Sequence, residues 1–322
     1  MSKFPKPRRI LEFCLAIFVF FCLGRYFTKK SELPKDFWLQ VQNANFANGS
    51  SRVLDKFCDS ECVYVVDVFI NGPEKHVMRA VTKEEEYIGS FVALSILKID
   101  ENDIDTSKWK VDHGLAAPNS IHAAQLNLLF KSGVIPLSQN LEGHTLIFGV
   151  ATGGTYMFLQ NLFPKMTITG LEISKQNIEI GKKWFGFKIN DQNEFLESNV
   201  LDYVKTSIDE KHRPNLVLVD ACVDFDCPPK SLLSDEFIKN LREIMKSDGV
   251  LSMNILTARD DFKEVYQYVK DKFSMHFDAC DYTQLSGYRN AIMTCYCSKK
   301  SYQPRKNTSK FLKHIGIMNN FY

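Results

Sequence analysis

Short apolar runs alternate with amphipathic stretches of helical spacing after Asn140, and this alternation constrains the fold more than any other feature of the sequence. It predicts strands buried on both faces, as in a parallel sheet covered by helices on each side. We predict seven strands, at 145–149, 167–172, 194–199, 215–220, 249–254, 274–280 and 291–297. The last two are joined by a segment too short for a helical crossover, so we expect the final strand to run antiparallel to its neighbour. The expected α/β domain covers residues 113–298.

A smaller unit is expected before this domain. In CVYVVDVFINGPEKHVMRAV, a β-branched run, the turn pair Asn71-Gly72 and a second short run predict a β-hairpin. We assign a small β-rich subdomain to residues 58–112. A helix is expected between Pro118 and Gly133, because apolar residues recur there at helical spacing and glycine ends the pattern.

Two further segments have a polar composition. Residues 28–57 are rich in asparagine and serine, which predicts a stalk. Residues 299–322 are basic, and we expect them to form a solvated tail.

The N-terminus has the pattern of a membrane-targeting segment. Residues 1–9 carry four basic side chains, and the apolar run of residues 10–27 follows them, interrupted by Glu12 and Arg25. As a helix this run would be about 27 Å long, close to the hydrocarbon thickness of a thin bilayer. We predict a single transmembrane signal-anchor at 10–27. The alternative is a cleaved signal peptide, but no small-x-small cleavage site follows the run.

Orientation in the membrane depends on weaker signals. Basic residues lie on both sides of the apolar run, and a slight excess before it favours a cytoplasmic N-terminus. The folded part would then lie in the secretory lumen or outside the cell. Sequons for N-glycosylation at Asn48 and Asn307 agree with this orientation, although such tripeptides also occur by chance.

Seven cysteines follow the apolar run, so at least one is unpaired. The close pairs Cys58/Cys62 and Cys222/Cys227 can form disulfides in an oxidising lumen, whereas in the cytosol they would remain thiols. The cysteine spacings do not repeat as those of a zinc-ligand set do, so we expect no metal site.

Charge argues against one class of partner. The chain has 40 basic and 38 acidic residues, a formal charge of +2, and this balance gives no long-range field for nucleic acid. We therefore expect no nucleic-acid partner. A homodimer remains an open alternative.

The loop after the first predicted strand is the first candidate for ligand binding. Gly149 and Gly153 permit a tight turn and close approach of the backbone to a ligand, and Ala151 narrows the loop by one methyl group. In a doubly wound sheet, ligands bind beyond the carboxyl ends of the strands at this kind of position. The alternative is a glycine turn between strand and helix that holds no ligand.

Three acidic residues end or follow the next predicted strands. Glu172 comes 19 residues after Gly153 and can accept hydrogen bonds from ribose hydroxyls; otherwise it is a solvated acid at a helix start. Asp202 can accept a bond from an adenine amino group or cap a helix. Asp220 ends a buried strand, where it suits a general base or an anchor for a substrate amine.

Several motifs together resemble the spermidine synthase-like branch of the class I S-adenosylmethionine-dependent methyltransferases. They are LIFGVATGGTYMFLQNLFP, ITGLEIS, GKKWFGF, VLVDACVDFDCPP and SDGVLSMNIL. The resemblance implies a Rossmann-like seven-stranded sheet, S-adenosylmethionine as cofactor, and transfer of a methyl or aminopropyl group. On matching positions it implies that residues 149–153 face the methionine part, Glu172 the ribose, Asp202 the adenine and Asp220 the acceptor.

The chain also departs from this family. Ala151 stands where the family loop resembles G-x-G-x-G, and Asp202 is followed by tyrosine rather than glycine. Asp220 and Asp224 are one residue too far apart for the D-x-x-D of aminopropyltransferases. We therefore expect a membrane-anchored methyltransferase with an unknown acceptor. The alternatives are a catalytically inactive binding ectodomain of the same fold and a polyamine aminopropyltransferase.

Overall fold

The computed structural model describes residues 33–34, 36–47, 49–59, 61–72, 75–83, 91–117, 120–206, 213–223, 226–286 and 289–317. Within these ranges, no helix combines the length and apolar character that crossing a bilayer requires. The predicted signal-anchor at 10–27 and the Asn48 sequon lie outside the described residues.

A mixed seven-stranded sheet forms the centre of the molecule, in the order β10-β11-β9-β8-β5-β6-β7. Its strands are β5 (Gly143–Phe148), β6 (Met166–Glu172), β7 (Glu194–Glu197), β8 (Leu216–Val219), β9 (Val250–Leu256), β10 (Ala279–Gln284) and β11 (Asn290–Tyr296). The five strands from β5 to β9 are parallel, and β11 is antiparallel to both β9 and β10. This confirms the predicted α/β fold and the antiparallel final strand.

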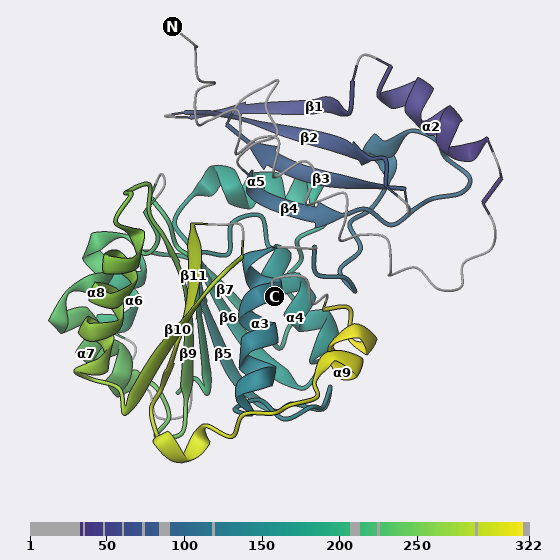
Figure 1. The fold of residues 1–322 in the computed structure, drawn as a ribbon. Helices are drawn as coiled ribbons and strands as arrows, with labels where there is room; N and C mark the ends of the chain where they lie inside the picture. Colours follow the sequence, from purple (N-terminus) through teal and green to yellow (C-terminus); the bar gives the residue numbers. More distant parts are fainter. Residues whose placement is uncertain are drawn as a thin grey trace, which may run out of the picture.

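Helices cover both faces of this sheet (Figure 1). One face carries α3 (Ile121–Ser132) and α4 (Gly154–Leu162), and the other carries α6 (Val200–Thr206), α7 (Asp235–Ile244) and α8 (Phe262–Ser274). Each face has its own apolar core. Gly133 ends α3 with a φ of 82°, as the sequence predicts. The start of α3 is capped by Ser120, which the sequence analysis did not single out.

One predicted strand is displaced. We expected a strand at 274–280, but α8 continues to Ser274 because its apolar stripe of Tyr266, Val269 and Phe273 remains buried. Strand β10 therefore begins only at Ala279 and uses residues that we assigned to the connection.

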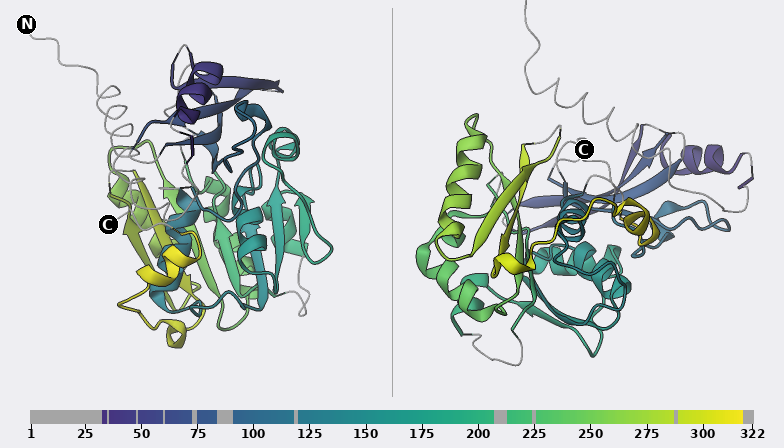
Figure 2. Two further views of the ribbon diagram at one scale, coloured as in Figure 1. Left: turned by 90° about the vertical axis from the view of Figure 1, so that its right-hand side faces the viewer. Right: turned by 60° about the horizontal axis from the view of Figure 1, so that its bottom comes forward.

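The N-terminal unit is larger than the predicted hairpin. The hairpin forms as β2 (Cys62–Ile70) and β3 (His76–Thr82), within a four-stranded antiparallel sheet that also contains β1 (Ser51–Cys58) and β4 (Phe91–Ile96). Helix α2 (Phe37–Asn45) packs beside this sheet, which lies above α4 and α5 (Lys175–Trp184) (Figures 1 and 2).

The expected stalk at 28–57 thus contains α2 and β1. Phe37 and Val41 of α2 are buried in an apolar cluster with Phe69 and Trp109, and β1 pairs with β2 along its whole length. The polar residues of this stretch masked apolar residues spaced for one helical face, so composition alone misled the prediction.

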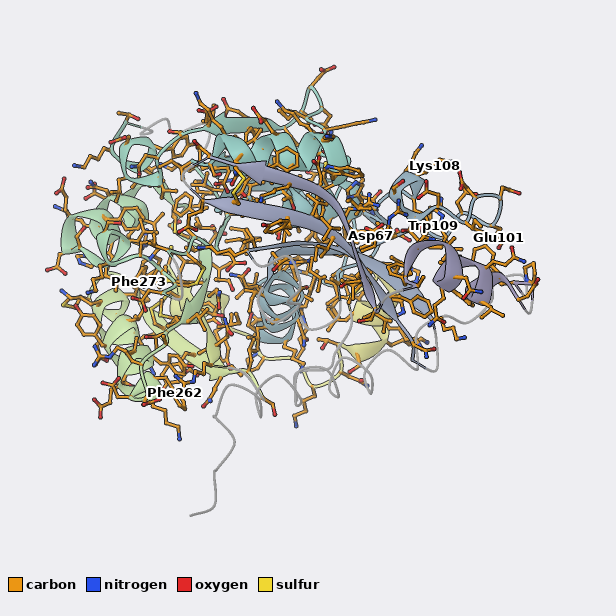
Figure 3. All side chains as sticks on the ribbon, turned by 90° about the horizontal axis from the view of Figure 1, so that it is seen from above. Asp67, Glu101, Lys108, Trp109, Phe262 and Phe273 are labelled. Atoms are coloured by element: carbon orange, nitrogen blue, oxygen red, sulfur yellow. A yellow bond between two sulfur atoms is a disulfide. The ribbon has the colours of Figure 1, made fainter. Side chains whose placement is uncertain are left out.

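A buried ion pair connects the N-terminal sheet to the central domain. The Nε of Arg79 lies 2.8 Å from Oδ1 of Asp67, and both side chains are almost fully buried. The guanidinium also donates to the carbonyl oxygens of Thr106, Trp109 and Trp184, the last at the end of α5. In Figure 3, Asp67 and Trp109 lie together in the N-terminal unit, apart from Phe262 and Phe273 of α8. Arg79 therefore joins three segments that are distant in sequence.

The C-terminal segment is not the solvated tail that its charge suggests. Helix α9 (Ser309–His314) buries Leu312, and Ile315 and Ile317 enter the core beside α3. Arg305 donates to the carbonyl oxygens of Phe130, Gly133 and Ile135 at the end of α3. The prediction failed because the apolar residues lie between lysines that remain exposed.

Candidate functional site

The loop between β5 and α4 lies where the strand order reverses, because β5 pairs with β6 on one side and β8 on the other. Gly149 has a φ of 82°, and a Cβ there would lie 2.5 Å from the carbonyl oxygen of Asp220. Only glycine allows this approach between two backbones. The loop thus meets the segment after β8 at the carboxyl edge of the sheet.

Ala151 adopts the left-handed conformation that glycine would favour, with a φ of 49°. Its backbone N–H donates to Oε2 of Glu172 at 2.7 Å. Alanine at position 151 therefore still adopts the turn that glycine would favour, and its N–H attaches the loop to the end of β6.

Replacing Ala151 with glycine is expected to raise the free energy of unfolding by up to about 1 kcal/mol, because a residue with a Cβ is strained at positive φ. The melting temperature should rise by about 2–4 °C in a calorimetric scan. Gly153→Ala is the control, since its Cβ would lie 2.4 Å from the Phe187 ring at a φ of 93°; that variant should melt lower than wild type. A lower melting temperature for Ala151→Gly would contradict the expected strain.

Glu172 is only 7% exposed, so it is not the solvated acid of the alternative interpretation. Besides Ala151, its carboxylate accepts the backbone N–H groups of Ile173 at 3.1 Å and Ser174 at 2.9 Å, both on Oε1. Since a carboxylate offers about four acceptor positions, one on Oε2 remains for a ribose hydroxyl. Ser174 itself caps α5 through the N–H of Asn177.

An exposed apolar side chain follows Glu172 and was missed at the sequence level. Ile173 is 68% exposed, although it follows directly on a buried strand. An exposed apolar side chain beside Glu172 offers a surface against which a planar ring can pack. Its signal in the sequence was a large apolar residue at a position where a helix start is normally polar.

Asp202 is exposed in the first turn of α6. The cap that we considered for it is instead Asn199, whose side chain accepts the N–H of Leu201 at 2.9 Å. The start of α6 lies beside the end of β6, because the N–H of Ser198 donates to the carbonyl oxygen of Glu172. The carboxylate of Asp202 is thus left available on the same edge of the sheet as Glu172.

Asp220 follows β8, and burial raises its pKa to about 6, while a hydrogen bond from Asn254 opposes this rise. The Nδ2 of Asn254 donates to Oδ1 of Asp220 at 2.8 Å, and Asn254 accepts in turn from Nδ2 of Asn290 at 2.9 Å. A carboxyl group with a pKa near 6 can exchange a proton close to neutral pH. Sequence reasoning missed Asn254, although a lone amide in the apolar run of β9 was a visible signal.

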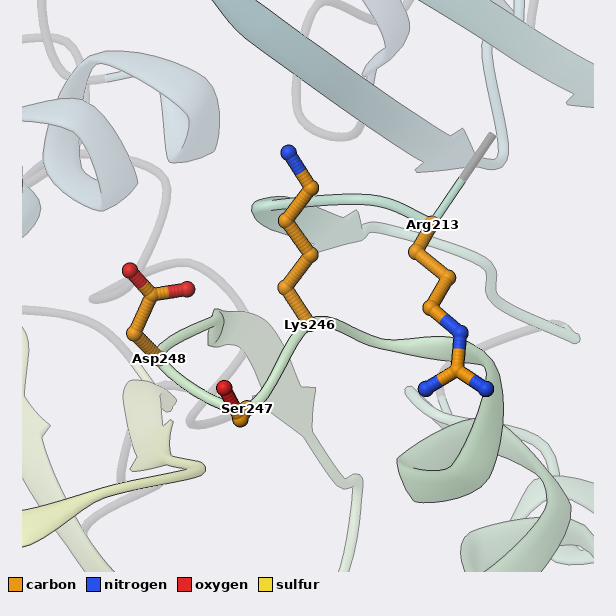
Figure 4. A pocket seen from close by; sticks show the side chains of 4 residues that line it. All are labelled: Arg213, Lys246, Ser247 and Asp248. Carbon is orange, nitrogen blue, oxygen red and sulfur yellow. The ribbon is translucent and has the colours of Figure 1, made fainter. Parts of the chain in front are cut away.

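A groove at the opposite edge of the sheet has no part in this site. Its lining residues, Arg213, Lys246, Ser247 and Asp248, precede β8 and β9 (Figure 4). They therefore lie at the amino ends of parallel strands, a sheet length away from the loop at Gly149.

Comparison with solved structures identifies the fold. Human Methyltransferase-like protein 13, solved in complex with SAH, superposes with a TM-score of 0.50 at 22% identity, covering 61% of this chain and 88% of that one. A probable spermidine synthase from Corynebacterium glutamicum superposes with a TM-score of 0.53 at 10% identity, covering 82% and 84%. The fold is that of the class I S-adenosylmethionine-dependent methyltransferases. No family model matches the chain.

Part of the chain is also similar in sequence to curated methyltransferases. The eEF1A lysine and N-terminal methyltransferase of Bos taurus is 27% identical over 122 residues, 36% of this chain and 17% of the relative. The Xenopus laevis protein of the same name is 22% identical over 206 residues, 60% of this chain and 29% of the relative. The chain therefore spans less than a third of the length of either relative.

Proposed function

We propose that this protein binds S-adenosylmethionine at the carboxyl edge of its sheet and transfers the methyl group to an amine. One observation carries the proposal: the loop at 149–153 touches the backbone of Asp220 and bonds to Glu172, so the predicted cofactor and acceptor groups converge. The methyltransferase relatives and the fold support the choice of cofactor.

The residues present suit this cofactor. Loop 149–153 would hold the methionine part, Glu172 has one free acceptor position for a ribose hydroxyl, and Asp202 is available for the adenine amino group. The bound cofactor would supply an electrophilic methyl group. Asp220 would receive or hold the proton of the acceptor amine, which must lose it to become nucleophilic, and its pKa of about 6 suits that role. The relatives' names, which specify lysine and N-terminal methylation, support an amine acceptor.

Calorimetric titration of the purified full chain with S-adenosylhomocysteine tests the binding step. We expect saturable binding that Asp220→Asn leaves intact, because Asp220 faces the acceptor. Absence of heat at millimolar ligand would overturn the proposal.

A catalytically inactive binding protein of this fold is the second candidate, and Ala151, which stands at a position of the loop where glycine would be favoured, supports it. It predicts ligand binding without any transfer of labelled methyl groups to cellular protein. Aminopropyl transfer is the third candidate. It requires spermidine to form from putrescine and decarboxylated S-adenosylmethionine, and we expect none.

We also propose that the chain is a single-pass membrane protein with its folded part in the secretory lumen or outside the cell. Disulfides between Cys58 and Cys62, Cys222 and Cys227, and Cys280 and Cys295 support an oxidising compartment. The exposed Asn307 is accessible to glycosylation. A glycosidase shift that Asn48→Gln and Asn307→Gln abolish is the expected result. Digestion of the folded part by protease added to intact microsomes would contradict this orientation.

A further inference from the structure

The disulfide between Cys222 and Cys227 follows Asp220 closely in sequence and joins a cysteine at the surface to a buried one. Cys222 is exposed, whereas Cys227 is 2% exposed. Cys227 is fixed to the end of β9 by two backbone hydrogen bonds with Leu256, of 2.9 and 2.8 Å. The disulfide therefore ties the segment that leaves β8 to the neighbouring strand.

The Sγ of Cys222 packs against one oxygen of the Asp220 carboxyl group. The Sγ of Cys222 lies 3.9 Å from Oδ1 of Asp220, and a disulfide sulfur has no hydrogen to donate, so the contact is van der Waals packing. The same oxygen accepts the amide of Asn254. Oδ1 of Asp220 thus meets both an amide donor and an apolar sulfur, and these two contacts limit the access of water to this oxygen.

We propose that the Cys222–Cys227 disulfide is a positioning element of the acceptor end of the site, which holds and shields Asp220. This inference rests on the proposed function, because it concerns the carboxyl group that would meet the acceptor amine. It implies that the acceptor end is complete only where the disulfide can form, in an oxidising compartment.

The effect of the disulfide should be local. It joins residues five apart, and a ring this short removes less entropy from the unfolded chain than a long ring does. The backbone of Asp220 is also held independently by its N–H bond to the carbonyl oxygen of Phe148 at 2.9 Å. A variant without the disulfide should therefore fold and still lose the sulfur that packs against Oδ1 of Asp220.

Cys58–Cys62 provides a matched control. It also joins residues close in sequence, four apart, and Cys58 is exposed like Cys222. It closes the turn between β1 and β2 in the N-terminal sheet, away from Asp220. Removing it repeats the chemical change without altering the surroundings of the carboxyl group.

The test is a pH titration of the Asp220 carboxyl carbon by NMR, in full chains labelled with ¹³C at aspartate carboxyl groups. Asp220→Asn assigns the signal. Wild type should titrate with a pKa of about 6, and Cys222→Ser/Cys227→Ser should titrate about one pH unit lower, because water reaches the carboxylate. Cys58→Ser/Cys62→Ser should titrate as wild type does. Cys222→Ala/Cys227→Val, which keeps the buried position apolar, provides a second variant in case the serine pair fails to fold.

Each outcome decides the proposal. An unchanged Asp220 titration in both variants lacking Cys222–Cys227 would overturn it, and so would an equal shift in the Cys58–Cys62 variant. S-adenosylhomocysteine binding, measured on the same samples, should be the same in all of them. If wild type does not bind this ligand, the proposed function fails, whereas the titration still reports whether the disulfide shields Asp220.

Discussion

Replacing Arg79 with alanine is expected to lower the free energy of unfolding by about 3–5 kcal/mol, because it leaves a buried carboxylate without its partner. Asp67 is fully buried, and Arg79 binds both of its oxygens. The loss also removes the donors to Trp109 and Trp184, which connect the N-terminal sheet to the central domain. Urea denaturation followed by circular dichroism measures the change.

The deficit should depend on pH in a defined direction. Burial raises the pKa of Asp67 even with Arg79 present, and Arg79 opposes this rise. Without Arg79 the folded-state pKa rises further above its unfolded value, so the folded state binds the proton more tightly. Stability then falls as pH increases through that pKa, and the deficit should be smaller at pH 5 than at pH 8.

Lys83→Ala is the control for the Arg79 variant, since it removes an ion pair with Glu61 whose side chains are 47% and 63% exposed. Exposed pairs contribute at most about 1 kcal/mol. A joint change of Arg79 to methionine and Asp67 to leucine should recover much of the lost stability, because no buried charge remains unpaired. Equal losses for Arg79→Ala and Lys83→Ala would refute the role assigned to the buried pair.

Replacing Glu172 with alanine is expected to cost about 2–4 kcal/mol of stability and at least about 10-fold in affinity for S-adenosylhomocysteine. The backbone N–H groups of Ala151, Ile173 and Ser174 lose their acceptor, so the turn at Ala151 is no longer fixed to the end of β6 by a side chain. Thermal unfolding and calorimetric titration measure the two effects on the same sample.

Two comparisons separate these effects. Glu179→Ala removes an exposed acid from the following helix and should change neither quantity. Asp202→Ala should weaken binding but leave stability nearly unchanged, since no backbone donor depends on its carboxylate among the described contacts. Stable folding of Glu172→Ala with wild-type affinity would show that the carboxylate neither holds the loop nor meets the ligand.

The central sheet was predictable because each of its strands is a short apolar run in the sequence, and the amphipathic stretches between these runs mark where the strands end. The positions of Glu172 and Asp220 at strand ends follow from those patterns, and the structure brings both to the loop at Gly149. The contacts that define their chemistry were not predictable, because they come from other strands. Asn254 reaches Asp220 only through the pairing of β8 with β9, and the Cys280–Cys295 disulfide depends on the register of β10 with β11.

Composition misled us where few apolar residues make many contacts. The stretch assigned to a stalk contributes Phe37 and Val41 to a core, and the basic tail contributes Leu312. In both segments most of the charged and amide side chains remain at least partly exposed to solvent, and because they are numerous they make the average composition of the segment polar. Burial is decided by individual positions, which a segment average does not resolve.

The attachment of the C-terminal segment to α3 has a consequence for synthesis of the chain. The last carbonyl groups of α3 accept donors from Gln303 and Arg305, about 170 residues later in sequence. Domains generally begin to fold from the N-terminus as they emerge from the ribosome, but this helix end stays incomplete until the segment up to Ile317 has emerged. A ribosome stalled before that point would hold a chain with its sheet translated and one face of its core still open to chaperones and proteases.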